Sequence, residues 1–107
     1  FWYSFVHETE SQVILNGSYD VGFTMDLVCK DVGLFDKLTK KYKIPAEISN
    51  LIYSIFKDGK KILGNRALST SIVKILEKKC NDDLRAEGFP SILKDKNNKK
   101  IAKELKI

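Results

Sequence analysis

Long apolar segments, metal-ligand clusters and a glycine-rich nucleotide loop are all missing from this 107-residue chain. No run approaches the roughly 18 apolar residues of a membrane-spanning helix, so we expect no membrane association. His7 is the single histidine and the two cysteines lack a C-x-x-C spacing, so we expect no metal site. No Gly-x-Gly-x-x-Gly follows a strand, and no Ser-His-Asp set is visible. We therefore expect no catalytic residue within this chain.

Proline, glycine and arginine are also scarce. Two prolines and six glycines in a chain that is 43% hydrophobic and 31% charged fit a mostly helical globule. No alternating pattern longer than about four residues indicates a strand. The sequence predicts one all-α domain over residues 1–93, followed by a Lys-rich tail over 94–107.

The positive charge lies mainly in that tail. Six lysines against two carboxylates in residues 94–107 account for +4 of the net charge of +5. A nucleic-acid-binding domain usually carries a basic face over its folded part, so we expect no nucleic-acid partner. One alternative stays open: a small helical binding module whose basic tail recognises an acidic protein or nucleic acid.

Helix-start and helix-stop residues divide the chain into four expected helices. The first runs from about Thr24 to Tyr42, the second from Pro45 until it fades near 58–59, the third from Ser69 or Thr70 to about 80, and a short fourth spans 84–87. Residues 16–18, Asn-Gly-Ser, predict a turn. The second helix carries an expected core stripe at helical spacing, made up of Ile48, Leu51, Ile52, Ile55 and Phe56.

The first of these helices has a carboxylate where an apolar residue belongs. At 100° per residue six apolar residues fall on one stripe: Leu27, Val28, Leu34, Phe35, Leu38 and Tyr42. Asp31 lies near the middle of this stripe, Lys30 at its edge and Cys29 away from it. A buried carboxylate needs a partner. Two alternatives stay open for the stripe: it belongs to the core, or it faces a wet crevice. Two also stay open for Lys30 and Asp31: they form a polar binding site, or they are an ordinary surface charge pair.

This stretch also resembles the β-hydroxyacid dehydrogenases, the family of 3-hydroxyisobutyrate, tartronate semialdehyde and L-threonate dehydrogenases and glyoxylate/succinic semialdehyde reductases. Gly22-Phe23, Leu27 and residues 30–34 are similar to the family's Gly-Phe…Lys-Asp-Leu segment. The likeness covers about residues 12 to 90, in register, through further segments at 13–20, 43–45, 51–53 and 68–73. Two departures are Ala67, where the family usually has Asp, and a slightly longer stretch from Tyr53 to Gly64.

The resemblance implies a fold and a parent enzyme. The chain would be the C-terminal helical domain of the 6-phosphogluconate dehydrogenase/3-hydroxyisobutyrate dehydrogenase type, roughly the last third of a cytoplasmic NAD- or NADP-dependent dehydrogenase. The Rossmann domain, the interdomain helix and the catalytic lysine would lie upstream. Lys30 would contact the dinucleotide, and Phe23 and Asp31 would line the substrate side of the cleft. Partners would be the protein's own Rossmann domain and further copies in a homo-oligomer.

The resemblance also implies that the isolated chain is inactive as a dehydrogenase. The aromatic cluster at the start of the chain would pack beneath the interdomain helix in an intact enzyme; it consists of Trp2, Tyr3, Phe5 and Val6. Without that helix, we expect the cluster to fold back on the domain or to promote self-association.

Overall fold

The fold is helical across residues 4–91, the part of the chain that this computed structural model describes. In these residues no strand forms beyond one isolated bridge between Thr24 and Leu68. The all-α prediction is therefore confirmed. The elements are α1 (Phe5–Asn16), α2 (Met25–Lys41), α3 (Glu47–Leu63), the 3-10 helix η1 (Ser69–Ile72) and α4 (Val73–Cys80).

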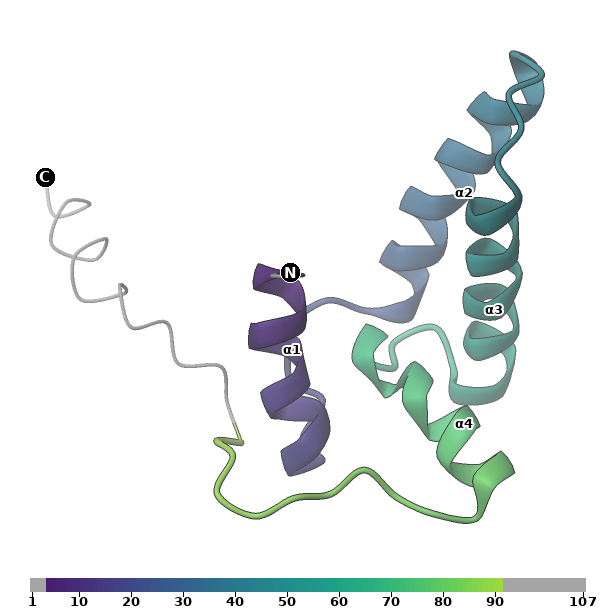
Figure 1. The fold of residues 1–107 in the computed structure, drawn as a ribbon. Helices are drawn as coiled ribbons and strands as arrows, with labels where there is room; N and C mark the ends of the chain where they lie inside the picture. Colours follow the sequence, from purple (N-terminus) through teal and green to yellow (C-terminus); the bar gives the residue numbers. More distant parts are fainter. Residues whose placement is uncertain (1–3, 92–107) are drawn as a thin grey trace, which may run out of the picture.

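An antiparallel hairpin of α2 and α3 makes up one side of the molecule (Figure 1). At its base, η1 contacts α3 and leads into α4, while α1 stands on the other side and touches η1. The predicted first helix matches α2 closely, and Thr24 occupies the N-cap position in extended conformation. The Lys-rich tail and Trp2 and Tyr3 lie outside the described residues.

Small side chains let the two arms of the hairpin approach closely. Gly33 faces the ring of Tyr53, and a Cβ added at Gly33 would lie 3.1 Å from that ring. The Cys29 thiol donates a hydrogen bond to the carbonyl oxygen of Phe56 (3.2 Å), and burial raises the pKa of that thiol. Apart from Met25, the buried face of α2 thus consists of small and polar residues.

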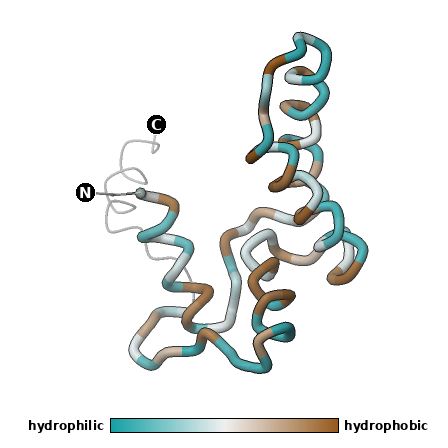
Figure 2. Tube along the Cα trace, turned by 45° about the vertical axis from the view of Figure 1, so that its right-hand side comes forward, coloured by the Kyte–Doolittle hydropathy of each residue, from teal (hydrophilic) through white to brown (hydrophobic). Residues whose placement is uncertain are grey.

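Of the two alternatives for the apolar stripe of α2, the structure supports the one in which the stripe lies outside the core. The stripe is largely exposed, including Leu27, Leu34, Phe35, Leu38 and Tyr42, whereas Cys29 is buried. The core stripe predicted for the second helix is wrong, because in α3 Ile48, Leu51, Ile52 and Ile55 are exposed and Phe56 is half-buried. Figure 2 shows hydrophobic residues recurring along both arms of the hairpin. The physical reason is that glycine, cysteine and threonine allow tighter helix contact than leucine does.

A buried carboxylate does lie in α2, but it is Asp36 rather than Asp31. Lys40 Nζ lies 2.7 Å from Asp36 Oδ2, and the Asn50 amide, oriented as its neighbours require, donates to Asp36 Oδ1 (2.8 Å). The Asp36 side chain is 5% exposed. This carboxylate joins α2 to α3 near the tip of the hairpin, and its charge is compensated there.

The second helix extends beyond its predicted end. We expected it to fade near Asp58 and Gly59, but α3 continues to Leu63. Gly59 is buried against Ile72 and Met25, which leave no room for a side chain. The residue that looked like a helix breaker is therefore a packing contact inside a continuous helix.

Two further helix predictions differ from the structure near the C-terminal end of the described chain. The third helix begins as η1 and continues as α4, and the Thr70 hydroxyl donates to the Tyr19 carbonyl rather than capping the helix. The fourth helix predicted at 84–87 does not form. Arg85 and Ala86 instead bind carbonyl oxygens at the end of α1, so this segment runs along another element.

The sequence did not predict α1, because its apolar residues show little helical periodicity. Ser4 caps it by accepting from the backbone N–H of His7 (3.3 Å). Gly17 ends it in left-handed conformation (φ +88°), as expected for the turn at 16–18. In the expected aromatic cluster, Val6 is exposed on α1, and the Phe5 side chain lies outside the described set.

Candidate functional site

The start of α2 is held by the loop that precedes η1. Three backbone hydrogen bonds join the two segments: Ser69 N to Phe23 O (2.8 Å), Met25 N to Ala67 O (2.7 Å) and Asp26 N to Asn65 O (3.0 Å). Because Ala67 contributes its carbonyl oxygen, the missing family aspartate at this position leaves the backbone pairing intact. The loop therefore sets where Phe23 and the first turn of α2 lie.

Side chains add to this clamp at the helix N-terminus. The Thr24 hydroxyl donates to Asp26 Oδ1 instead of capping the backbone, and Arg66 lies 3.6 Å from Asp26 Oδ2. The hydrogen bond from Thr24 is the main reason why the pKa of Asp26 is lowered; burial opposes it, and the Leu27 N–H and Arg66 add to the lowering. Sequence reasoning placed Asp26 in the first turn but missed Arg66, which lies 40 residues away and has no local pattern.

Lys30 and Asp31 lie in the second turn of α2, and their side chains form an ion pair of 3.3 Å. The two side chains are 61% and 58% exposed. The helical wheel correctly places Asp31 among Leu27, Leu34 and Leu38, but this face is open rather than buried. Of the two interpretations, the structure supports the one in which the apolar stripe lies outside the core of this domain.

We call this surface the α2 outer face: Leu27, Asp31, Leu34, Leu38 and Tyr42. Phe23 lies two residues before α2, half-buried, and its carbonyl is engaged by Ser69. The described contacts bring Lys30 and Asp31 together and do not join Phe23 to either of them. Chemically, the pair offers an accessible ammonium and an accessible carboxylate beside an apolar surface.

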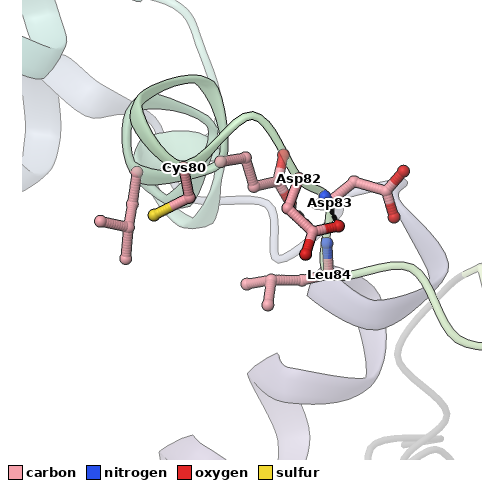
Figure 3. A pocket seen from close by; sticks show the side chains of 6 residues that line it. Cys80, Asp82, Asp83 and Leu84 are labelled. Carbon is pink, nitrogen blue, oxygen red and sulfur yellow. Dashed lines mark hydrogen bonds between the residues drawn. The ribbon is translucent and has the colours of Figure 1, made fainter.

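A hollow lies at the C-terminal end of α4, and neither Lys30 nor Asp31 lines it. Figure 3 shows Cys80 and Leu84 pointing towards the same space, with Asp82 and Asp83 beside them. Leu76 and Glu77 complete the lining, and Glu77 is occupied by an ion pair with Arg85 (3.3 Å). The described residues contain no group of three or more possible metal ligands, and none of their helices is long and apolar enough to cross a membrane.

One comparison with known proteins matches most of this chain. A family model described as the NAD-binding domain of NADP-dependent 3-hydroxyisobutyrate dehydrogenase matches residues 3–76. That match spans α1, α2, α3, η1 and the first part of α4, and it includes Phe23, Lys30 and Asp31. No curated protein and no solved structure matches the chain. Since the match covers more than half of the sequence, the chain belongs to the family of 3-hydroxyisobutyrate dehydrogenase-like NAD-binding domains.

Proposed function

We propose that this chain is the C-terminal domain of an NAD- or NADP-dependent enzyme that oxidises a β-hydroxyacid, or reduces its semialdehyde, by hydride transfer. The observation that carries the proposal is the exposed pair Lys30 and Asp31 within the segment that matches the family. In this proposal the parent enzyme acts in the cytoplasm, and its catalytic lysine lies upstream of Phe1.

The chemistry of the α2 residues fits a cofactor at this position. Lys30 carries an ammonium on a flexible stem, and its exposure leaves it able to reach a ribose or phosphate oxygen as a point charge. The nicotinamide cofactor would supply hydride acceptance or donation when bound. Lys30 would hold the dinucleotide, and Asp31 would orient Lys30 or a substrate hydroxyl. Phe23 would exclude water from the substrate side.

The α2 outer face fits the upstream part of the parent protein as its partner. Its leucines are exposed and surround the Lys30–Asp31 ion pair, in which Lys30 already compensates the Asp31 carboxylate. Contact with an apolar surface of the upstream part would remove these leucines from water. We accordingly propose the protein's own Rossmann domain and interdomain helix as the partners of this face, and a homo-oligomer as the assembled state.

The first test is a dinucleotide titration. We expect the isolated 107-residue chain to have no dehydrogenase activity and to bind NAD or NADP weakly, because one lysine does not replace a pyrophosphate site at a Rossmann helix. Isothermal calorimetry measures this directly. Submicromolar binding by the isolated chain would contradict the proposed division of labour between the two domains.

The second test uses variants of the parent enzyme. Lys30→Ala should lower kcat/KM for the dinucleotide by about ten- to a hundredfold, the equivalent of a charged hydrogen bond of about 1.5–3 kcal/mol. Lys37→Ala is the matched control, since Lys37 is exposed two turns further along α2. A double-mutant cycle with Asp31→Ala should give a clearly non-additive loss if Asp31 orients Lys30. Kinetics of Lys30→Ala within twofold of the parent enzyme would overturn the site assignment.

A further inference from the structure

Arg66 lies in the loop that holds the start of α2. Its neighbours in the chain, Asn65 and Ala67, both accept hydrogen bonds from the first backbone N–H groups of that helix, at 3.0 and 2.7 Å. The same loop leads to Ser69, whose N–H donates to the carbonyl oxygen of Phe23. The position of Arg66 relative to the first turn of α2 is therefore set by backbone hydrogen bonds on both sides of it.

The Arg66 guanidinium is open to solvent. The side chain is 80% exposed, and its ion pair with Asp26 measures 3.6 Å, which is too long for a good hydrogen bond. In the part of the chain that the structure describes, no residue accepts a hydrogen bond from it. Arg85, by contrast, donates to α1 and to the loop after it. Arg66 can thus present the planar fork of its guanidinium to a ligand, and this fork matches a carboxylate with two parallel hydrogen bonds.

Asp26 fixes the direction of this guanidinium. The Thr24 hydroxyl donates to Asp26 Oδ1, and the other oxygen, Oδ2, is the one that pairs with Arg66. The same hydrogen bond is the main reason why the pKa of Asp26 lies below its ordinary value, so the carboxylate stays ionised. Asp26 precedes Lys30 by four residues, which places them about 40° apart around the helix axis. Arg66 and Lys30 therefore lie on one side of α2, with Arg66 at the end that Phe23 precedes.

We propose that Arg66 binds a carboxylate group of the hydroxyacid substrate, with Asp26 fixing the direction of the guanidinium. Lys30, one turn further along α2, then serves the dinucleotide, so the two cations bind different reactants. Every β-hydroxyacid carries a carboxylate, and an anion that enters a cleft without water needs a cation to replace its hydration. Arg66 lies at the Phe23 end of α2, and Phe23 is the residue proposed for the substrate side. This assignment rests on the proposed function and deepens it by naming a residue that recognises the substrate.

The first experiment is steady-state kinetics of the parent enzyme. Arg66→Gln should lower kcat/KM for the hydroxyacid by roughly 10–100-fold, mostly through KM, because hydrogen bonds between two charged groups are lost. Arg66→Lys keeps the charge without the fork and should lose less. Lys61→Gln is the matched control, since Lys61 is 74% exposed and has an ion pair of 3.8 Å.

The Michaelis constant for the dinucleotide separates the two reactants. It should stay within about twofold of the wild-type value in Arg66→Gln and in Lys61→Gln. If Arg66→Gln raises it and leaves KM for the hydroxyacid unchanged, Arg66 binds a phosphate of the cofactor, and the proposal is overturned.

The second experiment measures binding without turnover and tests whether Arg66 only supports the start of α2. The hydroxyacid is titrated by calorimetry into the parent enzyme saturated with reduced dinucleotide, a combination that cannot react. Arg66→Gln should raise Kd at least about tenfold. Asp26→Asn breaks the same ion pair but keeps the guanidinium, so it should raise Kd less. Equal increases for the two variants would mean that the ion pair acts only on the backbone clamp, and would overturn the proposal.

Failure of this proposal is distinguishable from failure of the proposed function. A wild-type parent enzyme that does not oxidise hydroxyacids contradicts both. An active wild-type enzyme in which Arg66→Gln and Lys61→Gln behave alike contradicts the role of Arg66 alone. Both substitutions replace exposed side chains with weak ion pairs, so circular dichroism should show Tm within about 3 °C of the wild-type value for each.

Discussion

Removing the Arg85 side chain should weaken the contacts that join α1, the loop after it and α4. Its guanidinium donates to the Ile14 carbonyl (3.1 Å) and the Tyr19 hydroxyl, pairs with Glu77 (3.3 Å) and lies 5.0 Å from the centre of the Tyr19 ring. These contacts join α1, the loop after it and α4. Arg85 thus satisfies a carbonyl at the C-terminal end of α1, where a cation also complements the helix dipole.

The size of the effect follows from these contacts. A hydrogen bond to a charged group contributes about 1.5–3 kcal/mol when buried, but the Arg85 side chain is 36% exposed and solvent screens part of this. We therefore expect Arg85→Ala to lower the free energy of unfolding by about 2 kcal/mol, or Tm by about 10 °C. Urea unfolding of the 107-residue chain, followed by circular dichroism at one protein concentration, measures this.

Arg66→Ala is the matched control for that measurement. Arg66 is 80% exposed and makes a single ion pair of 3.6 Å, so its loss should cost under about 0.5 kcal/mol. If Arg85→Ala and Arg66→Ala destabilise the chain equally, the packing of the 82–86 segment against α1 does not exist in solution as described.

Two further predictions concern Gly17 and Asp26. Gly17→Ala should destabilise the chain by about 1–2 kcal/mol more than Gly22→Ala in the same unfolding assay. Both glycines have positive φ, so both substitutions strain the backbone. Only at Gly17 would the added Cβ also meet a side chain, 2.5 Å from Arg85 Nε, whereas at Gly22 it meets nothing within 4 Å. Because the pKa of Asp26 is lowered in the folded chain, its stabilising contribution is present above its unfolded pKa and is lost as pH falls through the folded one. Thr24→Val removes the main cause, so a carboxyl NMR titration should show the pKa of Asp26 rising towards its ordinary value; an unchanged titration curve would refute this account.

The positions of α2 and most of α3 were predictable because local chemistry sets them. The proline just before α3 and the apolar periodicity of both helices act within a few residues, whereas Thr24 occupies the N-cap position of α2 without making a capping hydrogen bond. The sequence likewise predicted Asp31 among apolar residues with Lys30 at its edge. These features survive in the structure because they depend on the 100° step of a helix alone.

Which face of α2 is buried was not predictable in the same way. Periodicity shows that a helix has an apolar side, but it does not state what that side meets. The contact of α2 with α3 is made through Cys29, Gly33 and Asp36, none of which stands out as a core residue. Besides Lys40 one turn away, Asp36 binds Asn50 across the hairpin, and this second contact cannot be read from residues close in sequence.

The errors at the ends of the domain have a different cause. Residues 84–87 looked like a short helix because a cap and a glycine flank them. Their backbone N–H groups instead donate to Leu15 O in α1 and to the carboxylates of Asp83 and Glu77. A four-residue helix makes few internal hydrogen bonds, so contacts such as Arg85 to Ile14 outweigh it. Tertiary contacts therefore determine the conformation of the short segment, whereas local helix propensity determines where the long helices form.

The inverted burial and the family membership support one another. A domain that used its large apolar residues for its own core would leave little for other surfaces, whereas here glycine and cysteine form the helix contact and leucine and isoleucine remain outside. Exposed apolar rows on a chain of this size are unfavourable unless they are covered. Two such rows remain on the described part of the chain: one on α2, which contains the Lys30–Asp31 ion pair, and one on α3, which is purely aliphatic.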